Sequence, residues 1–150
     1  MKYKFSLKVL LDHRKKLENE ARRNFMLAQS RVDDAITELN GFYDQVDRTR
    51  TENGDIEKSG GRASPKLMAN DDFIAGQKFR IEAQRLKIRE LKVIADELME
   101  IMIEAAKEAK TLEKLKERRT DEHKIAERKH ELKETDEIVV LRHKREGGMS

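Results

Sequence analysis

The sequence predicts an all-α fold in which two long helices form an antiparallel coiled-coil hairpin, with the second helix longer and overhanging the first. Three observations predict it. Of the 150 residues, 42% are charged and 5% aromatic; the only proline and three of the seven glycines lie between residues 53 and 72; and apolar residues recur every seven positions on both sides. Long helices with one narrow apolar stripe have such a composition. The spacing of the 37% apolar residues argues against disorder.

The first helix is predicted over about residues 4–51 by two rows of residues with seven-residue spacing. Ten of the twelve positions in these rows are apolar, as expected for a coiled coil. One row is Leu11, Glu18, Phe25, Val32, Leu39 and Val46, and the other is Leu7, Arg14, Ala21, Ala28, Ala35 and Phe42.

A loop is predicted over residues 53–71, where the sequence NGDIEKSGGRASPKLMAND interrupts the repeat. Ser64 and Pro65 could begin a short helical turn, because proline is favoured at the first helical position and serine before it. Asn70 and the two aspartates that follow supply capping groups for a second helix that begins near residue 72.

The second helix is predicted over about residues 72–145, and ten of its twelve seam positions are again apolar. Because the loop tethers two similar seams, the partner within the same chain is the nearer one. The alanine positions allow the helices to approach closely. The rows are Ile74, Ile81, Ile88, Ala95, Met102 and Ala109, and Gln77, Gln84, Leu91, Leu98, Ala105 and Leu112.

Beyond about residue 118 the second helix is expected to lack a partner, and we call residues 118–146 the C-terminal tip. The two helices would be roughly 70 Å and 110 Å long at 1.5 Å per residue, so that Phe5 faces the region of Glu117. Charged residues make up 21 of the 34 positions from 113 to 146, and neighbouring pairs of opposite charge support an exposed helix. The apolar run from Ile138 to Leu141 indicates either a docking surface or a contact within or between copies of the chain.

No catalytic, metal or cofactor site is predicted. Glu127 and His130 have a spacing used in di-metal bundles, but such a site needs carboxylates from further helices. The loop glycines lack the phosphate-binding pattern GxxxxGK[ST], and no pocket-forming fold surrounds a candidate triad. We therefore expect that the protein is not an enzyme and has no cofactor.

Charge, apolar runs and cysteine content indicate where the protein is located and which partners it can bind. The net charge is only +3 with interleaved signs, whereas a nucleic-acid interface needs clustered positive charge. No apolar run is long enough for a membrane span, the sequence starts without the apolar core of a signal peptide, and there is no cysteine. These features predict an intracellular, soluble protein.

With these residues in view, the chain resembles the FliJ family, the coiled-coil component of the bacterial flagellar type III export apparatus. The opening FSLKVLLDHRKKLENEA is similar to the family's N-terminal pattern, and Phe73-Ile74 followed by Ile81-Glu82 to its second helix. Glu131-x-Lys133-x-x-Asp136-Glu137 is similar to its C-terminal motif. The length and the break near the middle of the chain also agree.

The resemblance implies a central stalk within a hexameric export ATPase, which promotes ATPase assembly and activity and couples the ATPase to the membrane export gate and to export chaperones. It implies a cytoplasmic protein, peripheral at the inner-membrane base of the flagellum, that reaches the membrane only through partner proteins. The residues implied to face the ATPase are Glu131, Lys133, Asp136, Glu137 and Arg142. Those implied to face the cytoplasmic domain of the gate are Phe73 and Gln77, although positions 77 and 80 are usually apolar in the family and are Gln77 and Arg80 here.

Two alternatives stay open. One is the equivalent stalk of a virulence-type type III secretion system, which has the same architecture. The other is a helical hairpin associated with nucleic acid, which the near balance of charge disfavours. Its binding would weaken steeply with salt because counterions are released.

Overall fold

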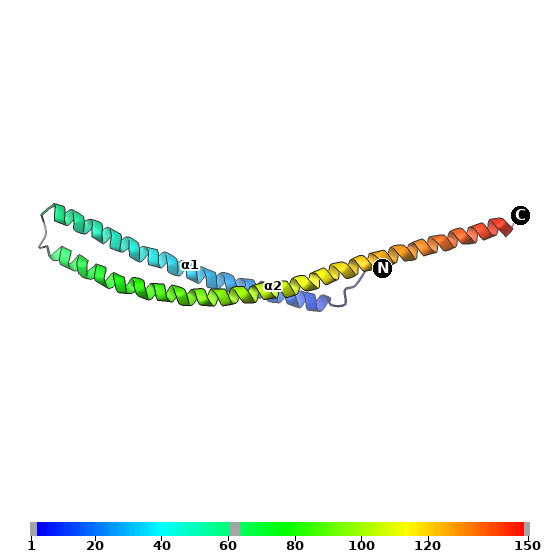
Figure 1. The fold of residues 1–150 in the computed structure, drawn as a ribbon, viewed down its shortest axis with the longest axis horizontal. Helices are drawn as coiled ribbons and strands as arrows, with labels where there is room; N and C mark the ends of the chain where they lie inside the picture. The colour runs from blue at the N-terminus through cyan, green and yellow to red at the C-terminus, as the bar shows by residue number, and fades with distance from the viewer. Residues whose placement is uncertain (1–2, 61–63, 149–150) are drawn as a thin grey trace. The chain divides into compact units, whose positions relative to one another are not determined.

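The computed structural model describes residues 3–60 and 64–148, and these form two helices, α1 (Lys8–Lys58) and α2 (Pro65–Gly148) (Figure 1). No strand occurs among the described residues. The two helices contact each other over much of α1, and α2 is the longer, with 84 residues against 51. The all-α helical hairpin with a longer second helix is thereby confirmed.

The chain divides into two compact units. One consists of Asn19–Ile103, and the other of Met1–Glu18 with Glu104–Ser150. Each unit contains a stretch of α1 and a stretch of α2.

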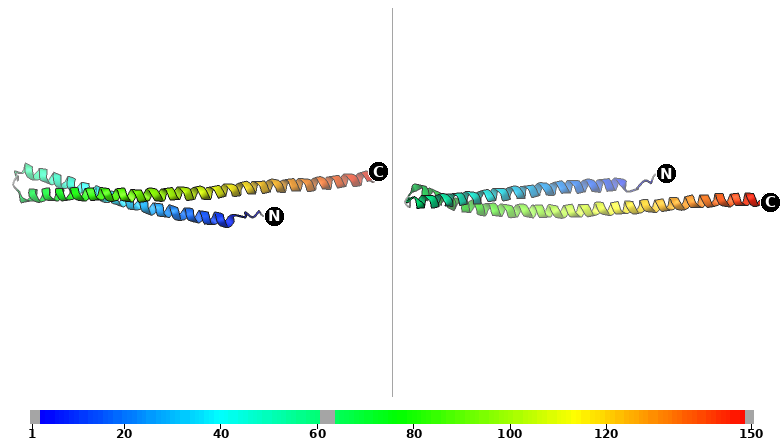
Figure 2. Two further views of the ribbon diagram at one scale, coloured as in Figure 1. Left: turned by 60° about the horizontal axis from the view of Figure 1, so that its bottom comes forward. Right: turned by 90° about the horizontal axis from the view of Figure 1, so that it is seen from above.

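The unit from Asn19 to Ile103 contains the antiparallel hairpin and its apolar core. The two helices lie side by side in both views of Figure 2. Ala28 and Val32 of α1 pack with Ala95 of α2, and Ile36, Leu91 and Leu98 pack around them. Two of the three central residues are alanines, whose small side chains allow the helix backbones to approach closely.

The predicted seam is confirmed position by position. All 24 residues in the four rows are buried or partly buried, and none is exposed. Beyond the predicted rows, Lys116 is exposed, Arg119 and His123 are still partly covered, and the later positions Ala126, His130, Lys133 and Glu137 are all exposed. A seven-residue frame therefore identifies the packed face of both helices.

The predicted loop over residues 53–71 is wrong in extent, because α1 continues to Lys58 and α2 already begins at Pro65. Gly60 takes a left-handed conformation with φ of 86° after the end of α1, a conformation that suits glycine. Ser64 Oγ accepts a hydrogen bond from the backbone amide of Lys66 (3.2 Å), so the predicted serine cap with proline at the first helical position is confirmed. Residues 61–63 lie outside the described residues.

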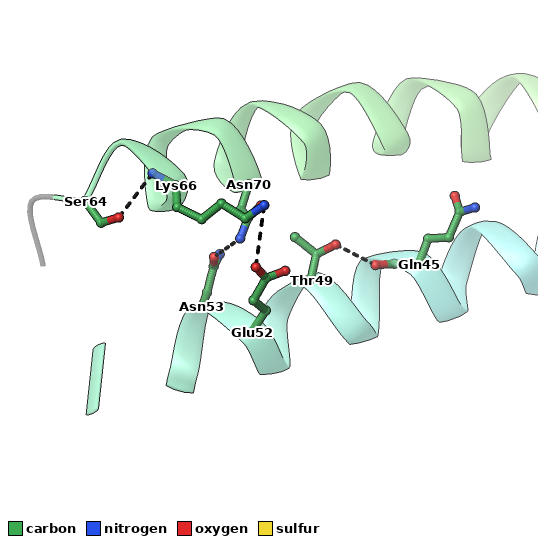
Figure 3. A network of polar contacts seen from close by, with 7 residues as sticks. All are labelled: Gln45, Thr49, Glu52, Asn53, Ser64, Lys66 and Asn70. Carbon is green, nitrogen blue, oxygen red and sulfur yellow. Dashed lines mark hydrogen bonds and ion pairs between the residues drawn. The ribbon is translucent and has the colours of Figure 1, made fainter. Parts of the chain in front are cut away.

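Asn70 was expected to cap the second helix, but it lies inside α2 and pairs with α1. Its side-chain amide donates to Asn53 Oδ1 (2.8 Å), and Asn53 Nδ2 donates to Asp71 Oδ1 (3.4 Å). Figure 3 shows the two asparagines between the helices. Lys66 also pairs with Glu52 across the hairpin (3.7 Å). These contacts extend the coiled coil toward the turn and explain why the helices are longer than predicted.

The other unit joins the start of α1 to the later part of α2. Arg14 pairs with Glu108, and Lys15 Nζ lies 3.0 Å from Glu113 Oε1. Ahead of α1, the buried Phe5 ring lies 5.9 Å from the guanidinium of Arg119. The predicted position of Phe5 near Glu117 is thus correct to within two residues.

The C-terminal tip begins later than the predicted residue 118. The Tyr3 and His123 rings contact each other with centroids 5.1 Å apart and planes tilted by 31°, and Ser6 Oγ accepts a hydrogen bond from Arg119 (3.2 Å). These contacts partly cover α2 as far as His123. Every residue from 128 to 147 is exposed, and we call residues 128–147 the exposed segment.

Candidate partner-binding surfaces

The five residues implied to face an ATPase all lie in the exposed segment of α2, and all are exposed. They do not share one face. With 3.6 residues per turn, Lys133, Asp136 and Glu137 lie on one side of the helix, whereas Glu131 and Arg142 lie eleven residues apart on another. The structure therefore distributes the charged side chains around the helix.

Lys133, Asp136 and Glu137 line a shallow surface groove together with Val140 and Leu141. Here the helix presents both signs of charge beside two apolar side chains. Such a surface can form ion pairs at its edge and an apolar contact at its centre, as protein interfaces do.

The two residues implied to face the export gate differ in accessibility. Phe73 is 40% exposed, whereas Gln77 is 1% exposed. The Gln77 side-chain amide donates to Gln45 Oε1 (2.6 Å), and its carbonyl oxygen accepts a hydrogen bond from Arg80 (3.2 Å). Gln77 could reach a partner only by breaking these bonds, so Phe73 is the accessible one of the pair.

Gln77 belongs to a buried polar row that the predicted heptad frame contains only in part. Asn70, Gln77 and Gln84 are spaced by seven residues, and all three are buried and bonded to α1. Gln84 Nε2 donates to the backbone carbonyl of Ala35 (2.9 Å) and to Glu38 (3.2 Å). The row satisfies its own polar groups, as burial requires, and thereby fixes how the helices align.

Sequence reasoning missed a second apolar row on α2. Phe79, Leu86 and Val93 are exposed and spaced by seven residues on the side away from the seam. The same heptad count that found the seam would have found this row.

No group of three or more potential metal ligands occurs in residues 3–60 and 64–148. His130, half of the Glu-x-x-His spacing, instead pairs with Glu134 (3.1 Å) on the helix surface. Over the same described residues, neither helix contains an apolar stretch that would reach across a bilayer.

Comparison with known proteins agrees with the geometry. The family model described as Flagellar FliJ protein matches residues 3–148, which is nearly the whole chain. No curated protein and no solved structure matches the chain. The matched range includes the hairpin and the exposed segment of α2 alike. The chain therefore belongs to the flagellar FliJ protein family, whose members are components of the flagellar export apparatus.

Proposed function

We propose that this protein is the non-enzymatic central stalk of the flagellar export ATPase complex. It promotes assembly and activity of the hexameric ATPase and couples it to the export gate and to export chaperones. The observation that carries the proposal is the exposed segment, in which α2 continues as a charged helix through twenty successive exposed residues. A helix with charges on all sides can enter the polar opening of a ring and make contacts in several directions.

In this proposal Glu131, Lys133, Asp136, Glu137 and Arg142 face the ATPase. Their distribution around the helix suits a ring that surrounds it better than a single flat surface. Phe73 faces the cytoplasmic domain of the gate, and the buried Gln77 contributes by holding α2 in register with α1 through Gln45. The protein would then lie at the cytoplasmic base of the flagellum and contact the membrane only through its partners.

The test is the rate of ATP hydrolysis by the purified flagellar export ATPase of the same organism. It is measured alone, with the full chain, and with a chain that ends after Glu127. This truncation keeps Arg119 and His123, which Phe5 and Tyr3 contact, so the hairpin should persist. Stimulation that needs residues 128–150 supports the stalk. Equal rates with all three preparations would exclude it.

The family match favours the flagellar system over a virulence-type secretion system. The two are separated by asking which of the two export ATPases the full chain stimulates. Binding to duplex DNA at 50 mM salt that is lost at about 200 mM salt, without ATPase stimulation, would instead support the nucleic-acid alternative.

A further inference from the structure

Four successive apolar residues interrupt the charges of the exposed segment. Ile138, Val139, Val140 and Leu141 are each between 52% and 62% exposed. Successive residues of an α-helix are about 100° apart around its axis. The four side chains therefore point in four directions, and together they encircle α2. We call these four residues the apolar collar.

The apolar collar lies between two bands of opposite charge. Residues 131–137 hold four carboxylates and one lysine, and residues 142–145 hold two arginines, one lysine and one histidine. After Arg128, Lys129 and His130, the exposed segment is therefore acidic over residues 131–137, apolar over 138–141 and basic over 142–145. A partner that complements it needs the same order with the charges reversed.

The arrangement around the axis restricts the partner further. A flat surface or a single helix covers one side of α2 and leaves the opposite side chains of the collar in water, where exposed apolar area is unfavourable. Only a partner that surrounds the helix removes all four from water. An antiparallel second copy of the chain would match the charges, but it would cover one side only.

We propose that the apolar collar is a binding surface that a ring of apolar side chains of the partner encloses on all sides. In this ring, basic groups face residues 131–137 and acidic groups face residues 142–145. The inference rests on the proposed function, in which the enclosing partner is the hexameric export ATPase. The inference adds which residues contact the ring and which kinds of side chain line the ring at each contact.

The experiment compares four full-length variants, Ile138→Gln, Val139→Gln, Val140→Gln and Leu141→Gln, with the matched control Ile125→Gln. Ile125 is also 52% exposed and lies on the same helix, before the acidic band. Glutamine is a good helix former, so α2 should remain helical, and circular dichroism checks this. Binding to the ATPase hexamer is measured by fluorescence anisotropy, together with the rate of ATP hydrolysis.

Each of the four collar variants should lower the affinity by about tenfold, since each removes a buried apolar side chain, while Ile125→Gln binds as the unsubstituted chain does. If binding is weakened only in variants whose side chains point to one side of α2, the contact is one-sided. This result would overturn the collar proposal but not the proposed function. Normal binding by all four would do the same. A dimer by light scattering that Val140→Gln dissociates would assign the collar to a second copy. If the unsubstituted chain neither binds nor stimulates the ATPase, the proposed function fails as well.

Discussion

Gln77 of α2 and Gln45 of α1 join their side-chain amides across the hairpin, with 2.6 Å between the Gln77 nitrogen and the Gln45 oxygen. Gln77 is buried, whereas Gln45 is exposed. A polar residue in a coiled-coil seam specifies alignment at a cost in stability. The pair therefore belongs to the features that determine which residues of α1 face which residues of α2.

Replacing Gln77 with leucine should raise the free energy of unfolding by about 1 kcal/mol. The exposed Gln45 can bond to water instead, so no buried polar group is left unpaired, and apolar burial is gained. Thermal unfolding followed by circular dichroism measures the change. Gln77→Ala is the control and should lower the melting temperature, because it leaves a cavity. A leucine variant that melts below the wild type would show that the hydrogen bonds outweigh apolar burial.

Ala28→Glu should unfold the hairpin unit, with a loss of at least about 3 kcal/mol. Ala28 is 7% exposed and packs against Val32 and Ala95, where a larger, charged side chain has neither space nor a partner. Met26→Glu is the matched control, since Met26 is 62% exposed on the same helix. Helical content and melting temperature are measured by circular dichroism for both variants. Wild-type stability of Ala28→Glu would contradict the observed seam.

The sequence predicted the packed faces of both helices because the seven-residue period is a rigid geometric property. Once Leu11 and Val32 are assigned to one row, every other member of that row follows. Tertiary packing changes such a pattern little, and the structure agrees at all 24 positions.

Helix ends were harder to predict. Local glycine and proline content indicates where a helix can end, but contacts between the two helices outweigh it. Gly54 lies inside α1, where nothing approaches within 4 Å of the position of an added Cβ. Glycine in a helix costs only roughly 0.5–1 kcal/mol relative to alanine. The Asn53–Asn70 hydrogen bond and the burial of Leu67 offset such a cost. These contacts depend on the alignment of the helices, which the local sequence does not contain.

The candidate site was predictable in part. Exposure of Glu131 and its charged neighbours followed from the failure of the seam. Burial of Gln77 also followed from the heptad frame, but its bonds to Gln45 and Arg80 depend on side-chain conformations that spacing alone does not specify. The position of Phe5 followed from the helix lengths, whereas Tyr3, which contacts His123, lies before α1 and belongs to no heptad row.

Two truncations should differ in stability. A chain ending after Glu127 should melt within a few degrees of the full chain, because the residues removed are exposed. A chain ending after Glu117 loses Arg119 and His123, which contact Phe5, Ser6 and Tyr3. It should be less stable by about 1–2 kcal/mol, since apolar area near Phe5 becomes exposed. Equal melting temperatures for the two would show that these N-terminal contacts contribute nothing.

The Lys15–Glu113 ion pair should be sensitive to alkaline pH. Its hydrogen bond and the nearby negative charge raise the pKa of Lys15 above the ordinary 10.5. A raised pKa in the folded state contributes stability below the unfolded pKa, and this contribution is lost as pH rises through the folded value. A double-mutant cycle with Lys15→Gln and Glu113→Gln should give a coupling energy that is constant between pH 7 and 9 and is lost as pH rises through the raised pKa of Lys15. A coupling that survives at the higher pH would exclude the ionic contribution.

Phe73→Ala should weaken binding to the cytoplasmic domain of the export gate and leave the hairpin folded. Phe73 is 40% exposed on α2, and exposed aromatic side chains commonly account for much of an interface's affinity, with losses of about 2 kcal/mol on truncation. Phe79→Ala is the matched control, because Phe79 lies on the same helix, is 80% exposed and has no proposed role at the gate. Calorimetric titration of each variant with the gate domain measures the affinity. About thirtyfold weaker binding for Phe73→Ala alone is expected. An equal loss of affinity for both variants would show that the contact includes Phe79 as well as Phe73. No loss of affinity for either variant would remove Phe73 from the gate interface.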